Sequence, residues 1–261
     1  MADDLLVVKD LTVEVIGSGR PRPIVKDVSF RLSAASILAL VGGSGSGKTT
    51  TGLSILRLLP PALRIVRGEI VFGGQSLLGL DGESMRRLRG RRLGMVFQEP
   101  LSAMNPVFSV GEQIEEVLRF HTDLAGQKRR EAVLDLLDRV EIPDPRRVYQ
   151  SYPHQLSGGM RQRAMIAQAI AASPGLIIAD EPTSSLDVTL QVRIMDLFRK
   201  LRKEMDLSIV LITHDLGVVA HLADEAVVLS GGEVVESGSV AQVLGSPKHP
   251  YTCRLLETLK V

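Results

Sequence analysis

Short runs of aliphatic residues alternate along the chain with longer segments in which apolar residues recur every three or four positions. The short runs are bounded by glycine, proline or charged residues, as buried strands are, and the longer spacing is typical of helices with one apolar face. This alternation predicts an α/β fold with a mainly parallel sheet that helices cover on both faces. The predicted strands are residues 5–8, 37–41, 95–97, 176–179, 209–212 and 226–229, and the predicted helices are residues 48–59, 110–120, 129–140, 160–172, 189–204 and 216–222.

Two regions depart from this alternation. Residues 11–16 and 24–32 alternate between apolar and polar positions on either side of a glycine- and proline-containing turn at residues 17–21. That pattern predicts a hairpin in an antiparallel β-subdomain at the N-terminus. Residues 100–156 carry mostly helical spacing and no strand signal, which predicts an inserted α-helical subdomain. We therefore predict one domain over residues 1–261, with a core of about 1–99 and 157–261 and an insert of about 100–156.

Composition and charge exclude several classes of protein. Hydrophobic residues make up 44% and charged residues 23% of the chain, which excludes a disordered protein. The 31 Lys+Arg and 30 Asp+Glu leave a net charge of +1, which argues against a general binder of nucleic acid or membrane surfaces. The single Cys253 excludes an intrachain disulfide framework and cysteine-built metal centres. The acidic start at Met1–Asp4 and the absence of an 18-residue apolar run favour a cytoplasmic location.

The strand predicted at residues 37–41 leads into a glycine-rich segment and then into a predicted helix. The segment has the form G-x-x-x-x-G-K-S/T in the strand–loop–helix setting that this phosphate-binding motif requires. Glycines let successive backbone N–H groups converge on phosphate oxygens, and the helix N-terminus adds partial positive charge. Lys48 can reach the β- and γ-phosphates of a nucleoside triphosphate, and the Thr49 hydroxyl can coordinate Mg²⁺. The predicted cofactor-binding residues of this loop are Gly42, Gly43, Ser44, Gly45, Ser46, Gly47, Lys48, Thr49 and Thr50.

Two acidic residues, Asp180 and Glu181, follow another predicted strand. The strand delivers Asp180 to the carboxyl edge of the sheet, where it can hold Mg²⁺ through water. Glu181 points elsewhere and could align and deprotonate an attacking water. This pair favours hydrolysis of a nucleoside triphosphate over transfer to a small acceptor. The strand at 209–212 brings His214 to the same edge, where a γ-phosphate contact is one interpretation, although a lone histidine is more often structural.

A second segment that could bind an anion, Leu156-Ser157-Gly158-Gly159, precedes another predicted helix. Ser157 suits the N-cap position, and the two glycines leave the first backbone N–H groups uncovered. The residues alone favour an ordinary capped helix, because the chain already holds one complete phosphate loop.

Taken together, these segments resemble the motifs of ATP-binding cassette (ABC) ATPases over nearly the whole chain. The phosphate loop resembles the family's Walker A motif, residues 156–160 its signature motif and residues 176–181 its Walker B motif. Gln98 is similar to the Q-loop glutamine, residues 185–187 to the D-loop and His214 to the switch histidine. The resemblance implies the ABC cassette form of the P-loop NTPase fold. One departure is that Val15 and Ile16 occupy the neighbourhood where the family usually places an aromatic residue against adenine, so the base contact stays open.

The resemblance also implies roles for particular residues. Glu181, His214 and Gln98 are expected to act in hydrolysis, and Thr49, Gln98 and Asp180 to hold Mg²⁺. The family forms head-to-tail dimers in which each ATP lies between one subunit's Walker A loop and its partner's signature helix. The residues expected to complete the partner's site are Ser157, Gly158, Gly159 and Asp187.

Three further segments are similar to ATPase subunits of oligopeptide, dipeptide and nickel importers. They are residues 96–106, 152–155 and 248–252. The short ending and the sequence of the phosphate loop are more similar to nickel-importer subunits. The resemblance implies a subunit at the cytoplasmic face of the membrane that couples ATP hydrolysis to uptake of nickel or of di- and oligopeptides. Its expected partners are a second, generally different ATPase subunit, transmembrane permease subunits and, indirectly, an extracytoplasmic substrate-binding protein, but no nucleic acid.

Two other functions stay open at this point. One is a soluble ABC ATPase that acts on nucleic acid or ribosomes, although such proteins commonly carry long coiled-coil inserts or two fused cassettes, and this sequence has neither. The other is a regulator that binds ATP without productive hydrolysis. The residues do not identify the transported substrate.

Overall fold

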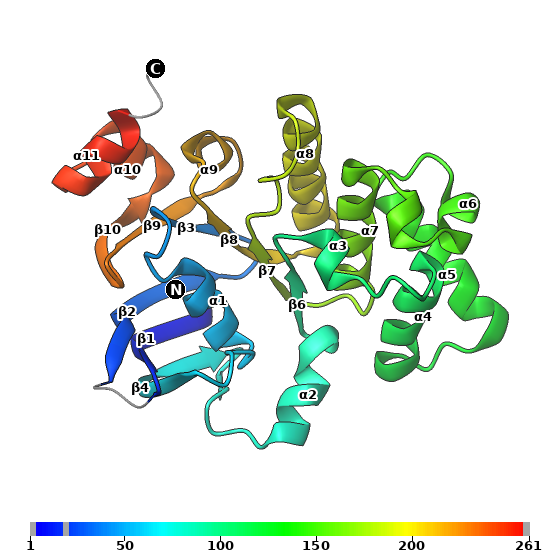
Figure 1. Ribbon diagram of the computed structural model, residues 1–261, viewed down its shortest axis with the longest axis horizontal. Helices are drawn as coiled ribbons and strands as arrows, with labels where there is room; N and C mark the ends of the chain where they lie inside the picture. Colours follow the sequence, from blue (N-terminus) through cyan, green and yellow to red (C-terminus); the bar gives the residue numbers. More distant parts are fainter. Residues whose placement is uncertain (1–3, 18–20, 258–261) are drawn as a thin grey trace. The chain divides into compact units, whose positions relative to one another are not determined.

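The computed structural model describes residues 4–17 and 21–257. Contacts divide the described residues into two compact units, the first from Met1–Met85 and Asp206–Val261 and the second from Arg86–Met205 (Figure 1). Most of the acidic start, the middle of the predicted turn at 17–21 and the end of the chain at 258–261 lie outside the described residues. The predicted division into a core and an insert stays a prediction. The whole of residues 100–156 falls within the second unit, together with the strand that ends at Asp180.

The first unit contains an antiparallel sheet with the strand order β2-β1-β4-β5. The predicted hairpin is confirmed, because the two longest strands pair from Asp4 opposite Ser33 to Val15 opposite Arg22. The strand predicted at residues 5–8 is the first part of the same long strand. The bounds are β1 Asp4–Val15, β2 Arg22–Ser33, β4 Leu63–Phe72 and β5 Gln75–Ser76.

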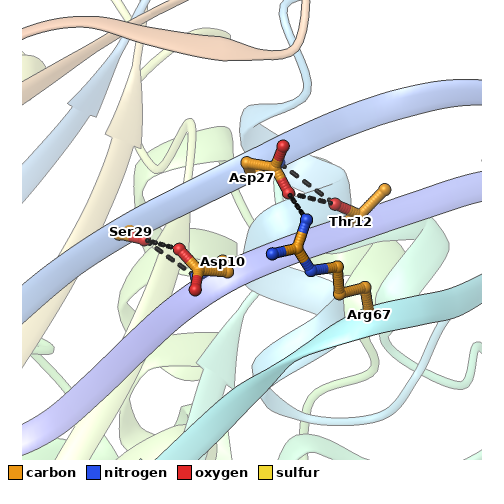
Figure 2. Close-up of polar contacts among 5 residues, drawn as sticks. All are labelled: Asp10, Thr12, Asp27, Ser29 and Arg67. Atoms are coloured by element: carbon orange, nitrogen blue, oxygen red, sulfur yellow. Dashed lines mark hydrogen bonds and ion pairs between the residues drawn. The ribbon is translucent and has the colours of Figure 1, made fainter.

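Four register shifts interrupt the pairing of β1 with β2, and polar side chains stabilise two of them, at Asp10 and at Asp27 (Figure 2). Asp10 and Asp27 have φ angles of 47° and 48°, in the left-handed region that non-glycine residues enter at a cost. The backbone N–H of Asp10 donates to Ser29 Oγ at 2.8 Å. Asp27 Oδ1 accepts from Thr12 Oγ1 and from Arg67 Nη1, each at 3.1 Å. These side-chain bonds satisfy backbone and carboxylate groups where the ladder is broken.

The first unit also contains the strands β10-β9-β3-β8, in that order. β3 runs parallel to both β8 and β9, whereas β10 is antiparallel to β9. Every residue of β3 and β8 is buried, as their continuous apolar sequences predict. The strands are β3 Ile37–Val41, β8 Ser208–Thr213, β9 Glu225–Ser230 and β10 Glu233–Ser239, and the helices are α1 Lys48–Ile55, α9 Leu216–Leu222, α10 Val240–Gly245 and α11 Pro250–Glu257.

The second unit pairs two parallel strands, β6 and β7, and carries most of the helices. The helices α4, α5, α6 and α7 pack against one another (Figure 1). A capping box in which Ser109 and Glu112 bond each other's backbone begins α4. The strands are β6 Leu93–Val96 and β7 Leu176–Asp180, and the helices are α3 Pro100–Ala103, α4 Val110–His121, α5 Gly126–Arg139, α6 Pro145–Gln150, η1 Pro153–Gln155, α7 Gly158–Ile170 and α8 Val188–Met205. Helix α2, Gly82–Arg91, crosses from the first unit into the second.

The predicted α/β class is confirmed, and the six predicted helices are all present, with ends displaced by up to four residues. The largest displacement is at α1, which ends at Ile55 because the chain turns at Leu56, whose N–H bonds the Ser54 carbonyl. The strand predicted at 95–97 begins at Leu93 and ends before Phe97. Each helix within residues 4–17 and 21–257 is too short or too polar to span a bilayer.

Candidate functional site

The loop between β3 and α1 has a backbone that only glycine fits at several positions. Gly45 and Gly47 have φ angles of 74° and 98°, which glycine adopts without steric cost. Gly47 is the N-cap of α1 and, being glycine, has no side chain to cap it. The N–H groups at a helix N-terminus favour an anion. A Cβ atom on Gly42 would lie 2.2 Å from the Leu229 carbonyl oxygen, an approach that excludes any larger residue.

Lys48 and Ser46 carry the side chains of this loop that would suit an anion. The Lys48 side chain is only 6% exposed, and its Nζ donates to the carbonyl oxygens of Gly42 and Gly43, each at 2.8 Å. A phosphate oxygen makes a stronger, charge-assisted hydrogen bond with an ammonium group than a neutral carbonyl oxygen does. Ser46 Oγ is buried and, among the described residues, has no hydrogen-bond partner. A buried cation and a buried hydroxyl that lacks a hydrogen-bond partner among the described residues, both beside a helix N-terminus, fit a bound polyphosphate.

His214 lies at the same edge of the sheet as the start of the phosphate loop. Thr213, the last residue of β8, pairs in parallel register with Val41, the last residue of β3. His214 follows directly and is exposed. Asp215 accepts from Gly217 N–H at 2.7 Å and Val218 N–H at 3.2 Å and caps α9. The predicted delivery of His214 to the carboxyl edge is therefore seen within the first unit.

The second unit brings Gln98 and Glu181 into contact. Val96 pairs with Ala179 in parallel register, so β6 and β7 end side by side. Gln98 lies two residues after Val96, and Glu181 lies two residues after Ala179. Gln98 Nε2 donates to Glu181 Oε2 at 3.1 Å. Glu181 has a φ of 43°, a left-handed conformation that costs a non-glycine residue on the order of 1–3 kcal/mol. Ser184 stabilises this turn, because its N–H and its Oγ both donate to the Glu181 carbonyl, at 3.2 and 3.1 Å.

Asp180 ends the fully buried strand β7 and is itself only 4% exposed. The carboxylate of Asp180, the hydroxyl of Thr49 and the amide oxygen of Gln98 are oxygen donors of the kind that Mg²⁺ prefers. Thr49 belongs to the first unit and the other two residues to the second.

The signature segment begins helix α7 with its first turn open. Ser157 is the N-cap, and its Oγ accepts from Met160 N–H at 3.4 Å. Ser157 and Gly158 are exposed, whereas Gly159 is buried against Leu190. The prediction of an ordinary capped helix is confirmed as a local structure. Because the exposed end shows backbone N–H groups to solvent, it can also receive an anion.

Asp187 has a local structural role in addition to the predicted one. Its Oδ1 accepts from Leu190 N–H at 2.9 Å and its carbonyl from Gln191 N–H at 2.9 Å, so it caps the start of α8. Its role toward a partner's nucleotide stays a prediction.

The sequence did not point to Tyr251 as part of this site. Its hydroxyl accepts the backbone N–H of Gly43 at 2.8 Å, so the C-terminal helix α11 contacts the phosphate loop. In the sequence, Tyr251 belongs to segment 248–252, which was noted for its similarity to importer ATPase subunits and not for a role at the phosphate loop. Ile16, considered for the adenine contact, is 52% exposed, and its N–H donates to the Ala62 carbonyl.

Comparison with known proteins gives consistent results. Residues 25–184 match the ABC transporter family. A Brucella ovis protein named for peptide import and ATP binding is 47% identical over 261 residues, which cover 98% of this chain and 77% of that protein. The oligopeptide transport ATP-binding protein OppD of Bacillus subtilis is 44% identical over 256 residues, covering 98% and 72%.

Solved structures agree with this assignment. A dimeric ATP-binding cassette in a post-hydrolysis state, bound to ADP and Pi, superposes with a TM-score of 0.81 at 29% identity, over 90% of this chain and 98% of that one. The cbiO1 protein of Clostridium perfringens, part of the ABC transporter complex cbiONQ, superposes with a TM-score of 0.80 at 25% identity, over 94% and 92%.

Proposed function

The chain belongs to the ABC transporter family, and on that premise we propose that it is the ATP-hydrolysing subunit of an importer of peptides. The observation that carries the proposal is the phosphate loop, in which a buried Lys48 and a Ser46 hydroxyl without a hydrogen-bond partner among the described residues adjoin the N-terminus of α1. Peptides are the proposed cargo because both relatives are named for peptide or oligopeptide transport. The preference for nickel drawn from the sequence stays a prediction.

The proposed binding of ATP uses the residues of the first unit. The N–H groups from Gly45 to Thr49 surround the phosphates, and Lys48 exchanges part of its contact with the loop carbonyls for phosphate oxygens. Thr49, Gln98 and Asp180 would hold Mg²⁺, which neutralises charge on the phosphates when bound. His214, at the same sheet edge as the loop, would contact the γ-phosphate.

The proposed hydrolysis depends on Glu181. Its carboxylate is held as an acceptor by Gln98 Nε2, and its backbone is fixed in a left-handed conformation by Ser184. A carboxylate held in this way can orient a water and accept its proton while the water oxygen bonds to the γ-phosphorus and the bond from that phosphorus to the bridging oxygen breaks. ADP leaves with the bridging oxygen, and phosphate is the other product. Gln98 would then link the state of the nucleotide to the helices that follow it, where the permease subunits would bind.

The proposal predicts ATP hydrolysis that a peptide stimulates. The chain, its second ATPase subunit, the permease subunits and the substrate-binding protein should be purified together and placed in proteoliposomes. Labelled di- and oligopeptides should enter with release of phosphate, and Ni²⁺ should not. Uptake of Ni²⁺ and not of peptides would overturn the proposed peptide cargo but would leave the proposed ATPase activity standing. Binding of ATP without any release of phosphate would instead support a regulator, and co-purification with nucleic acid would support the soluble alternative.

The head-to-tail dimer predicts that Gly158→Asp separates ATP binding from dimerisation. A Cβ on Gly158 would have only a Leu186 methyl within 4 Å among the described residues, at 3.8 Å. The helix dipole of α7 stabilises an acidic side chain in the first turn. The variant should therefore fold and bind ATP normally. If this tip meets a partner's ATP, the added negative charge should weaken ATP-dependent dimerisation by at least about tenfold, since like charges in contact cost several kcal/mol.

Gel filtration with light scattering, with Mg·ATP and the second ATPase subunit, measures this effect. Gly175→Asp is the matched control, because a Cβ there also meets open space. Dimerisation of the Gly158→Asp variant at the wild-type ATP concentration would contradict the proposed role of the signature helix.

A further inference from the structure

One peptide unit of the phosphate loop is held at both of its ends. The N–H of the Gly42–Gly43 peptide donates to Tyr251 Oη, and the C=O of the same peptide accepts from Lys48 Nζ, each at 2.8 Å. Because a peptide unit is planar, fixing the direction of its N–H also fixes the direction of its carbonyl oxygen. The tyrosine hydroxyl therefore sets the orientation of a group that holds the Lys48 ammonium.

This peptide needs an external restraint. It lies between two glycines, and glycine has no Cβ to limit rotation of the adjoining backbone bonds. A Cβ at position 43 would lie 3.1 Å from Tyr251 Oη, which is closer than an ordinary contact, so a larger residue there would displace the hydroxyl by a few tenths of an ångström. The absence of a side chain at Gly43 thus leaves room for the Tyr251 hydroxyl.

Tyr251 is held in place by both its backbone and its side chain. Its backbone N–H donates to His249 Nδ1 at 3.2 Å, and its ring packs against the buried cluster that includes Val41 and Val228. The N–H groups of Lys248 and His249 donate to the Glu236 carboxylate at 2.8 and 3.0 Å. Burial tends to raise the pKa of Glu236, but hydrogen bonds, these two among them, lower it below its ordinary value. The turn before α11 is thereby attached to β10 by a charged carboxylate.

We propose that Tyr251 is a positioning residue for ATP binding, which orients the Gly42 carbonyl and through it the ammonium group of Lys48. The proposal rests on the proposed function of the phosphate loop as an ATP site. It gives segment 248–252 a structural role within this chain, because this segment places the Tyr251 hydroxyl of helix α11 against the phosphate loop.

The test is Tyr251→Phe, which removes only the hydroxyl and keeps the ring that packs on the core. The Kd for Mg·ATP, measured by calorimetry on the full chain, should rise about two- to tenfold, the effect of one net hydrogen bond. The kcat at saturating ATP should stay at its wild-type value, because Tyr251 acts on the ground-state loop. The Tm should fall slightly, because the Gly43 N–H loses its acceptor while the ring stays packed. Tyr149→Phe is the matched control. It removes a hydroxyl that donates to Glu115 at 2.5 Å in the second unit, and it should leave the Kd unchanged.

A double-mutant cycle separates positioning from general support of the fold. In a Lys48→Met background, Tyr251→Phe should cause no further loss of affinity, because the group that it positions is gone. A second loss as large as in the wild-type background would overturn the proposal, as would an unchanged or lower Kd in the single variant. If the wild-type chain itself bound no Mg·ATP, the proposed function would fail first, and this inference with it.

Discussion

Glu181→Gln should reduce steady-state ATP turnover at least a hundredfold while leaving the affinity for ATP within about twofold, since a general base contributes about 10²–10⁴ to a rate. The amide has the shape of the carboxylate, and its oxygen can still accept from Gln98 Nε2. The left-handed backbone at position 181 and the bonds from Ser184 do not involve the side chain and should persist. Only the capacity to accept a proton is lost. Phosphate release and ATP binding, measured on the same preparation, give the two quantities.

Glu204→Gln is the matched control, because Glu204 is exposed on α8 of the same unit. It should turn over ATP at the wild-type rate. Near-normal turnover of Glu181→Gln would remove Glu181 from the role of base. Loss of ATP binding together with turnover would instead show that the side chain supports the structure of the site.

The elements near the phosphate loop were predictable because local chemistry determines them. β3 is apolar at every position and leads into glycines whose left-handed φ angles and close approach to Leu229 leave no alternative residue. The contact of Gln98 with Glu181 follows from the parallel register of β6 and β7, which brings the residues after both strands to one edge. In these cases residues close in sequence, or on adjacent strand ends, determine the geometry.

The features that the sequence did not predict depend on distant residues. The long strand β1 was predicted as two separate strands, because the bulge at Asp10 interrupts the alternation and is closed by Ser29 of the partner strand. Tyr251 lies 208 residues from Gly43, and a hydroxyl that bonds one backbone N–H leaves no periodic pattern. Such a pairing appears only when the fold brings α11 against the loop.

Lys48→Met should weaken binding of Mg·ATP by about ten- to a hundredfold, the range expected for loss of a charge-assisted hydrogen bond of about 1.5–3 kcal/mol. The effect should be larger than that of Tyr251→Phe, because methionine removes the charge and not only its orientation. Stability should change less than affinity. The variant leaves the carbonyls of Gly42 and Gly43 without the Nζ donor, which destabilises the fold, but it also removes a buried charge, which offsets that cost.

Calorimetry with Mg·ATP and a thermal melt of the nucleotide-free chain measure the two effects separately. Lys203→Met, on the exposed face of α8, is the matched control and should alter neither. The dependence of the loss of affinity on salt is a further check. The affinity lost with Lys48 is electrostatic in a largely buried site, so the ratio of the two Kd values should persist at raised ionic strength, because buried charges are screened less than exposed ones. A variant that bound Mg·ATP as the wild type does would show that the buried ammonium serves only the carbonyls of its own loop.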